Sequence, residues 1–463
     1  MFETLIINIL ALIVTLGILV TFHEFGHFWV ARRCGVKVLR FSVGFGKPFK
    51  SWYGKDGTEY AIAPIPLGGY VKMLGQDDLN TNADADLTEE LRQQSFNHKP
   101  LWQRTAIVAA GPLANFLLAI FVFWLINITY GQRGVVPVIA DVMPESPAYT
   151  AGLRPGDEII AVDGRETPVW QDVTMQLLNR LGETGEIRFT AVSQDNTTPR
   201  DHSVPILNWH SQTAEPNPLG SLGLIQYTSP PVIDGVTDDG PAARGGLQAG
   251  DVVLEADGQS INSWMHWVQI IRAHAELDLP VVVERGNEQV SLVLRPEVGT
   301  SAEGDRIGTI GAWVEPHDLY ASLPPEMRRE ISFNPLTAVA PAVRETWDKS
   351  VFVLESIQKM IVGLISYKNI NGPITIAQVA GETASYGPEV YLGFLALLSI
   401  SLGVLNLLPI PMLDGGHLLY YAIEAIIRRP VPERVQAMGL QVGLLLIVGL
   451  MTLAIFNDVT RLL

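Results

Sequence analysis

Three residues near the amino terminus, His23, Glu24 and His27, have the types and spacing of a metal-dependent hydrolytic site. On an α-helix, two histidines four positions apart project from one face and can share a metal ion, and Glu24 lies beside them, where it can take a proton from water. A polar turn on an ordinary amphipathic helix gives the same pattern. Here, however, the residues end a run from Leu5 to Ala31 that is otherwise almost entirely apolar. Because ionisable side chains in a membrane span are costly and seldom kept without a role, the metal site is the favoured interpretation.

A catalytic zinc ion usually has three protein ligands, so the two histidines need a third. Asp414 is the strongest candidate, because it is a carboxylate in the otherwise apolar stretch 406–424 and two glycines follow it, which let backbone approach closely. His417 is a chemically sound competitor, and Asp-Gly-Gly also suits an ordinary turn or cap. Asn406, at the start of the stretch, could hydrogen-bond a substrate backbone or bridge two helices.

Four apolar runs are candidate membrane spans that would position these residues. They are Leu5–Ala31, Thr105–Leu125, Leu392–Leu408 and Met438–Ile455. Lys and Arg are concentrated between the first and second runs and between the third and fourth, so the positive-inside rule places both of these loops in the cytoplasm. Both termini and the long segment 127–390 are then expected on the far side of the membrane.

The composition agrees with a membrane protein that also carries soluble modules. Of 463 residues, 48% are hydrophobic and only 17% are charged. The net charge of −16 argues against a nucleic-acid partner, which requires clustered Lys and Arg. The single cysteine, Cys34, excludes an internal disulfide framework. The first residues lack the basic region and cleavage site of a signal peptide, so we expect the first span to be retained.

Within the loop region 34–103, residues 36–43 and 59–74 have the composition of β-strands and are interrupted by glycines that include Gly68 and Gly69. They predict either a re-entrant element or a cytoplasmic cap, followed by a solvated loop at 76–99. A substrate helix must unwind before it is cut, and pairing with an edge strand here would replace its lost hydrogen bonds. Gly68 and Gly69 are therefore candidate substrate-binding residues.

The central segment contains an internal repeat, because residues 142–164 align without gaps to residues 236–258. Each copy resembles the circularly permuted bacterial PDZ domain, and we expect the two domains at 127–220 and 221–316. Such domains bind extended peptides, or they could merely pack or obstruct. The stretch Gly220–Leu224 is predicted to be a carboxylate-binding loop of the second copy, with Gly223 contacting substrate, and the first copy is expected to lack such a loop.

From residue 317 to 390 the apolar pattern has the steps of three and four residues that indicate an amphipathic helix. It carries too many charges to span a membrane. Such a helix would lie on the membrane surface or pack against the preceding domain. The third and fourth spans follow at 391–463.

Taken together, HEFGH on the first span (1–33), GPLAN on the second (104–126), GGYVKM, the tandem PDZ-like repeats, NGPITIA and NLLPIPMLDGG resemble the site-2 protease family. The resemblance covers nearly the whole chain and implies an intramembrane zinc metalloprotease of the bacterial inner membrane, with both termini and the PDZ-like domains in the periplasm. It implies that His23, His27 and Asp414 bind Zn²⁺, that Glu24 is the catalytic acid and base, and that Asn406 contacts substrate.

The resemblance also implies the partners and the fold class. The substrates would be single-span membrane proteins, such as an anti-sigma factor already trimmed by another protease, or leftover signal peptides, and the enzyme would act surrounded by membrane lipid. The expected fold is a polytopic α-helical membrane protein with four transmembrane helices, a membrane-associated β region and two extracytoplasmic PDZ-like α+β domains. Two alternatives remain open: a catalytically inactive PDZ scaffold, and a transporter, although no inverted repeat of the spans is visible.

Overall fold

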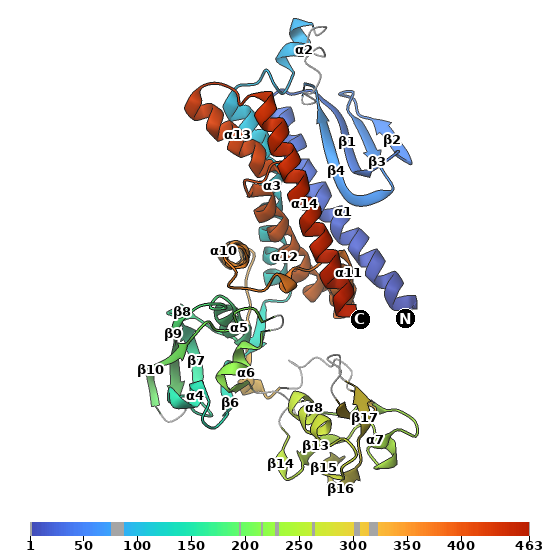
Figure 1. Ribbon diagram of the computed structural model, residues 1–463, viewed down its shortest axis with the longest axis vertical. Coiled ribbons are helices and arrows are strands. Elements are labelled where there is room, and N and C mark those ends of the chain that lie inside the picture. Colours follow the sequence, from blue (N-terminus) through green and yellow to red (C-terminus); the bar gives the residue numbers. More distant parts are fainter. Residues whose placement is uncertain are drawn as a thin grey trace. The chain divides into compact units, whose positions relative to one another are not determined.

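The computed structural model describes residues 2–75, 88–193, 196–213, 216–226, 231–261, 264–300, 306–313 and 323–462. The chain forms two compact units. The first comprises Met1–Gln132, Ser211–Glu215 and Ile331–Leu463, and the second Arg133–His210 and Pro216–Glu330. Figure 1 shows the elements of both. Residues 76–87, half of the predicted solvated loop at 76–99, lie outside the described residues, and the other half differs from that prediction, because it contains the short helix α2 (Glu89–Gln93) and the buried Phe96.

Four helices of the first unit are long and apolar enough to cross a membrane, and they coincide with the four apolar runs predicted as spans. They are α1 (Phe2–Arg33), α3 (Leu101–Thr129), α12 (Pro388–Leu407) and α14 (Glu433–Leu462). In the most apolar windows of α1 and α14 only 11% of residues are buried, so both helices leave most of their apolar side chains uncovered by protein. The corresponding window of α3 is 56% buried, because α1, α10, α12 and α13 all pack against that helix.

The helix α10 (Val339–Ile361) is the amphipathic helix expected within 317–390. Its inner face packs against α3 and α12, with Ala342 and Thr346 buried. Its outer face leaves Trp347 and Ile361 exposed. In Figure 1 the axis of α10 points toward the viewer while α3 and α12 run along the page, so α10 crosses the bundle. The structure therefore shows α10 packed against the long apolar helices, an arrangement that the two sequence-based alternatives, the membrane surface and the preceding domain, did not include.

The NGPITIA segment forms the start of α11 (Pro373–Ser385), and the last span holds it in place. The Asp458 carboxylate of α14 accepts hydrogen bonds from the Gly372 amide (2.9 Å), the Ile374 amide (2.8 Å) and the Thr375 hydroxyl (2.6 Å). Since the first amides of a helix have no partner within the helix, this carboxylate acts as a cap supplied by another element. The remaining helices of the unit are α2 (Glu89–Gln93), η2 (Tyr367–Asn369) and α13 (Asp414–Ile427).

The predicted β region forms a four-stranded sheet of order β2-β3-β1-β4. Its strands are β1 (Val38–Phe45), β2 (Lys50–Tyr53), β3 (Glu59–Ile62) and β4 (Ile65–Met73). Strand β1 pairs in parallel with β3 and antiparallel with β4, which is an edge strand. The inner face of the sheet buries Val38, Val71 and Met73 against Phe28 of α1 and Ile107 of α3. The sheet thus lies alongside the helix that carries the two histidines (Figure 1).

The second unit repeats one arrangement of strands, as the internal sequence repeat predicts. The first copy has a sheet of order β10-β9-β7-β8 and the second a sheet of order β14-β13-β15-β16. Taken from its other end, the second sheet corresponds to the first strand for strand, with β16 matching β10 and β14 matching β8. The first copy contains β6 (Ile139–Val142), α4 (Pro147–Thr150), β7 (Glu158–Val162), β8 (Arg165–Glu166), α5 (Trp170–Leu178), β9 (Gly185–Ser193), β10 (Asn196–Ile206), α6 (Pro218–Leu222) and β11 (Leu224–Gln226).

The second copy contains β12 (Gly235–Val236), α7 (Pro241–Arg244), β13 (Val252–Ala256), β14 (Gln259–Ser260), α8 (Trp264–Ala273), β15 (Leu279–Arg285), β16 (Glu288–Leu294), β17 (Glu297–Thr300), β18 (Arg306–Thr309) and β19 (Ala312–Trp313). A further pair, β5 (Gln132–Val135) and β20 (Arg328–Ile331), with η1 (Pro325–Met327), lies where the chain enters and leaves this unit. The likeness of each copy to a PDZ domain stays a prediction.

The expected carboxylate loop belongs to the other copy, so its assignment from sequence was wrong. Strand β11, which begins at Leu224, pairs antiparallel with β6 of the first copy, Leu224 opposite Val142. The first copy therefore extends beyond the predicted boundary at residue 220. The second copy ends in the same way, because β19 pairs with β12. Each copy thus carries its own glycine-containing loop at its carboxyl end.

The two loops are equivalent in backbone geometry. Gly223 and Gly311 both have positive φ, 77° and 67°, which a residue with a side chain adopts only with strain. The Gly223 carbonyl accepts a hydrogen bond from the Met143 amide (2.9 Å), and the Gly311 carbonyl accepts one from the Thr237 amide (2.7 Å). Met143 and Thr237 occupy matching positions of the sequence repeat. The loop of the second copy, at residues 308–312, could have been found from the sequence, because its residues GTIGA align with GSLGL at 220–224.

Candidate metal centre

The side chains of His23, His27 and Asp414 converge on one point. The Nε2 atoms of His23 and His27 are 3.2 Å apart, and the Asp414 Oδ2 lies 3.2 Å from the first and 3.5 Å from the second. Four tetrahedral ligands at about 2.0–2.1 Å from a zinc ion are about 3.3 Å from one another, so the three observed separations fit such an ion. The Asp414 Oδ2 is buried without a conventional hydrogen-bond donor, as expected of an atom that would face a cation.

Two glycines bring the histidine helix close enough to α3. A Cβ atom on Gly26 would lie 2.2 Å from the Ala110 carbonyl oxygen, and one on Gly111 would lie 2.2 Å from the His27 Nε2. Both separations are far shorter than any real contact, so α1 and α3 can cross here only through residues without side chains. This requirement explains the glycine inside HEFGH and the glycine that begins GPLAN.

The His27 ring is oriented by the backbone of α3. Its Nδ1 atom lies 2.8 Å from the Ile107 carbonyl oxygen, which can only accept a hydrogen bond. The Nδ1 atom therefore carries the proton, and Nε2 keeps a lone pair directed at Asp414 and His23. A metal-binding histidine commonly has its second nitrogen fixed in this way.

Asp414 is the first residue of α13, and Leu413 occupies the N-cap position without a side-chain cap hydrogen bond. A Cβ atom on Gly415 would lie 2.0 Å from the Leu408 carbonyl oxygen, and one on Gly416 would lie 2.6 Å from that of Ile410. The two glycines let the Pro-rich loop fold back against the start of α13, which turns the Asp414 carboxylate toward the histidines. Burial raises the pKa of the Asp414 carboxyl, but its contacts with His23 and His27 lower that pKa by more. The pKa therefore lies well below its usual range, and the group is ionised.

His417 lies in the same cavity but outside this cluster. Among the described residues, the group of potential ligands with all donor atoms within 4.8 Å of one another consists of His23, His27 and Asp414. The His417 ring instead stands edge-on to Tyr420, with ring centroids 6.4 Å apart. Burial lowers the pKa of His417, which favours the neutral imidazole. The geometry thus favours Asp414 over His417 as a third ligand.

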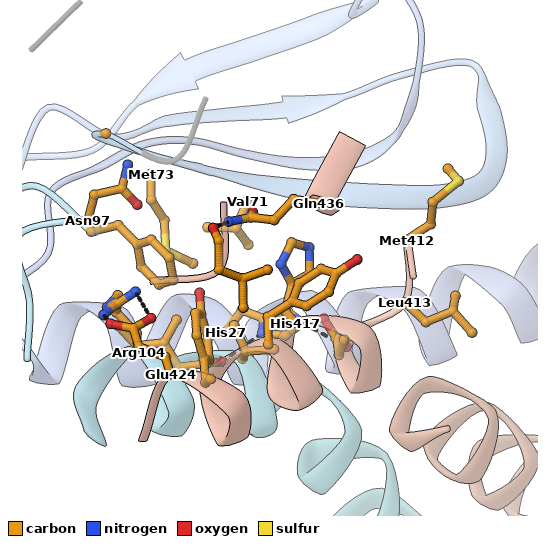
Figure 2. Close-up of a pocket in the computed structure, with 18 of the residues that line it drawn as sticks. His27, Val71, Met73, Asn97, Arg104, Met412, Leu413, His417, Glu424 and Gln436 are labelled. Carbon is orange, nitrogen blue, oxygen red and sulfur yellow. Dashed lines mark hydrogen bonds and ion pairs between the residues drawn. The ribbon is translucent and has the colours of Figure 1, made fainter. Parts of the chain in front are cut away.

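A cavity of about 910 Å³ surrounds the cluster and contains the other predicted site residues of the helices. Glu24, Asn406 and His417 all line it. Figure 2 shows Val71 and Met73 approaching this cavity from the sheet, and His27 and His417 from the helices. Glu24 interacts with the Val71 backbone amide, so it lies between the histidines and strand β4.

Comparison with known proteins agrees with this geometry. The sequence model of peptidase family M50 matches residues 11–450. The chain belongs to peptidase family M50. It is 44% identical to a Vibrio cholerae protein provisionally named a zinc metalloprotease, over 98% of this chain and 99% of that one. It is 43% identical to the regulator of sigma-E protease RseP of Escherichia coli and to the protease RseP of Yersinia pestis, each over 98% of this chain and 99% of the relative. The resemblance to the site-2 proteases is thereby confirmed.

In this M50 peptidase, an ion pair that the sequence did not reveal also lines the cavity. The Arg104 guanidinium of α3 binds both oxygens of the Glu424 carboxylate of α13, at 2.6 and 3.3 Å (Figure 2). Its charge also lies over the Tyr421 ring, 5.0 Å from the centroid. Both charged side chains are largely buried, and the pair ties the Asp414 helix to α3. The two residues are 320 positions apart, so nothing local in the sequence could pair them.

The glycines predicted to bind substrate have packing roles in the structure. A Cβ atom on Gly68 would lie 2.2 Å from the Phe45 ring, and one on Gly69 would lie 2.6 Å from the Ser42 carbonyl oxygen and 3.2 Å from the Glu24 side chain. They allow β4 to lie tightly on β1 and across α1 at Glu24. A Cβ atom on Gly223 would lie 2.2 Å from the Cβ atom of Ser146, so the loop of the first repeat can pack against Ser146 only because residue 223 has no side chain. Contact of these glycines with substrate stays a prediction.

Proposed function

We propose that this protein is an intramembrane zinc metalloprotease that hydrolyses a peptide bond within the membrane span of single-span proteins. The observation that carries the proposal is the convergence of His23, His27 and Asp414 beside Glu24, on and next to helices long enough to cross a membrane. Membership of peptidase family M50 and a relative named for zinc metalloprotease activity support the same reaction and the same ion.

The donor set and its spacing suit zinc. Two neutral imidazole nitrogens and one carboxylate oxygen would hold the ion and leave its fourth position open, as catalytic zinc sites do. When bound there, zinc polarises a carbonyl oxygen and makes water a nucleophile at neutral pH. Glu24 takes the proton from the attacking water and delivers it to the leaving amine. Asn406 lines the same cavity and offers an amide to the substrate backbone.

Strand β4 is the element that would present the substrate. It is the edge strand of its sheet, and it crosses α1 at the Glu24 side chain. A substrate helix that unwinds loses its internal hydrogen bonds, and pairing with a free strand edge replaces them. The cleaved bond would then lie between β4 and the cluster of His23, His27 and Asp414.

The biological substrate we propose is an anti-sigma factor that another protease has already shortened, with leftover signal peptides as further candidates. Relatives named as regulators of sigma-E support this assignment. We place the enzyme in the bacterial inner membrane, with both termini and the repeated unit in the periplasm, because the basic loops then face the cytoplasm. The repeated unit would exclude substrates that still carry a large periplasmic domain.

The experiment that tests the proposed reaction uses full-length protein purified in detergent. Metal analysis should give about one zinc ion per chain, and the same preparation should cleave a model protein with a single span. Removal of zinc with a chelator should abolish cleavage, and added zinc should restore it. An intact preparation that holds no zinc and leaves the substrate uncut would favour the inactive scaffold instead.

A further inference from the structure

Asn115 of α3, the last residue of GPLAN, lies behind the His23 ring. Its side chain is fully buried, and its Nδ2 atom is 3.1 Å from the His23 Nδ1. Its Oδ1 atom, equally buried, has no hydrogen-bond partner. A buried amide oxygen without a donor is uncommon and calls for an explanation. Rotating the amide by 180° would exchange its nitrogen and oxygen and bring the oxygen to His23.

The two histidines differ in the group that contacts the Nδ1 atom of each ring. Behind His27 is the Ile107 carbonyl, which can only accept, so the tautomer of that ring is fixed. Behind His23 is an amide, which donates through one atom and accepts through the other. With Nδ2 toward the ring, His23 Nδ1 accepts and Nε2 carries the proton, 3.2 Å from the Asp414 Oδ2. This arrangement gives His23 Nδ1 a donor without a metal, and it leaves the Asn115 Oδ1 without a partner.

A metal ion reverses the requirement at His23. The ion takes the lone pair of Nε2, so the ring proton must move to Nδ1, and Nδ1 then needs an acceptor. Among the described residues, Asn115 is the one whose side chain hydrogen-bonds to His23 Nδ1, so its amide oxygen would supply the acceptor. The exchange leaves the number of hydrogen bonds of the Asn115 side chain unchanged, because one of its two polar atoms is without a partner in either orientation.

We propose that Asn115 is a positioning residue for the metal ligand His23, and that its amide rotates between a donating orientation without the ion and an accepting orientation with it. The backbone of Asn115 does not need to move for this, since its carbonyl oxygen is held by the Ser399 hydroxyl of α12 at 2.8 Å. The inference rests on the proposed metal site, which zinc binding by the unaltered protein tests by itself.

The test measures the zinc dissociation constant of full-length protein in detergent by competition with a chromophoric chelator. Asn115→Leu removes the acceptor, and we expect zinc affinity to fall about 10- to 100-fold, as for loss of other partners behind a metal-binding histidine. Asn115→Asp has nearly the same shape and can only accept. We expect it to bind zinc at least as tightly as the unaltered protein, because it offers the acceptor permanently.

The aspartate variant separates positioning from packing. If Asn115 serves as a donor or only fills space, Asn115→Asp will lose zinc as Asn115→Leu does, and the proposal is wrong. Equal affinity in all three proteins would also overturn it. Ser399→Ala is the matched control, since it removes a buried partner of the same residue on its backbone side and should leave zinc affinity within about twofold. If the leucine variant does not fold, the comparison of Asn115→Asp with the unaltered protein decides.

A failure of this inference can be told from a failure of the proposed function. If the unaltered protein binds no zinc, the metal site itself is wrong. If the unaltered protein binds zinc and Asn115→Asp loses it tenfold or more, the site stands and the role of Asn115 falls. Cobalt substituted for zinc gives a second readout that does not depend on cleavage, because its visible absorption should stay unchanged in Asn115→Asp.

Discussion

Two carboxylates in the cavity have different surroundings, and these suit them to different roles. Asp414 points its Oδ2 atom at both imidazoles, whereas Glu24 interacts with the amide of Val71 on β4. A ligand must face the ion, and a general base must face the water and the bond that is cut. At the scale of single residues, these orientations support the proposed roles, metal binding for Asp414 and proton transfer for Glu24.

Replacing Glu24 by Gln should separate these two roles. The amide keeps the shape of the side chain but cannot take up a proton, so cleavage should fall by about 10²- to 10⁴-fold, the usual contribution of a general base. Zinc content should stay at the level of the unaltered protein. The measurement is a turnover assay beside metal analysis of the same sample, and substantial remaining cleavage would remove Glu24 from the mechanism.

Replacing Asp414 or His417 by Ala tests the third ligand. Asp414→Ala removes an atom that lies 3.2 and 3.5 Å from the two imidazoles, so both zinc and cleavage should be lost. His417→Ala should retain the metal, because that ring stands apart against Tyr420. Metal analysis of the two variants decides, and the opposite pattern would transfer the third ligand to His417.

At the scale of elements, the site depends on how closely α1 and α3 approach. The space for His27 exists because Gly26 and Gly111 carry no side chain where the helices cross. The Arg104–Glu424 pair then holds α13, and with it Asp414, to the same helix α3. Helix α3 is thus the common support for ligands that come from both ends of the chain.

The variant Gly26→Ala tests the close crossing of α1 and α3. Its new methyl group would meet the Ala110 carbonyl at 2.2 Å, so the helices must separate, at a cost of about 1–3 kcal/mol for such overpacking. We expect a lower melting temperature and weaker zinc binding. Gly17→Ala on the same helix is the control, since a Cβ there meets nothing within 4 Å and should be neutral or stabilising by up to about 1 kcal/mol. Equal behaviour of the two variants would contradict the role of the crossing.

At the scale of the whole molecule, the repeated unit lies almost entirely between two points of the helical unit. The chain leaves the helical unit after Gln132, touches it again at Ser211–Glu215 and returns to it at Ile331. These two points are neighbours, because a Cβ atom on Gly131 would lie 2.7 Å from the Ile331 carbonyl oxygen. A linker of a few residues can therefore replace residues 133–330.

We expect the protein without residues 133–330 to cleave a substrate that still carries a large periplasmic domain. The unaltered protein should cleave only the trimmed form, if the repeated unit acts by excluding bulk. Cleavage of both forms by both proteins is compared in reconstituted vesicles. Should the shortened protein reject the untrimmed form and cut the trimmed form normally, exclusion by the repeated unit is wrong.

Exclusion and peptide binding can be distinguished at the two loops. Replacing Gly220–Leu224 and Gly308–Ala312 together by flexible segments should leave cleavage of trimmed substrate within about threefold if the unit only excludes bulk. Loss of that cleavage would instead show that the loops must hold a substrate end. Changing one loop alone would not separate these mechanisms, since each copy has a loop with the same backbone geometry.

The sequence by itself determined those features that depend on neighbours along the chain. His23, Glu24 and His27 share a helix face because the helical repeat is local, and the four spans follow from the length and apolarity of single segments. The likeness of the two copies to each other was implied by the repeat. The motifs were also sufficient to identify the family.

Only the tertiary structure decided what depends on contacts between distant segments. It placed Asp414 rather than His417 with the histidines, because helix packing and the Pro-rich loop set the direction of each side chain. It gave the Gly220–Leu224 loop to the first copy, because strand pairing follows hydrogen bonds and not the edges of an aligned repeat. It also brought Asn115 behind His23, a contact 92 positions apart along the chain and set by the crossing of α1 and α3.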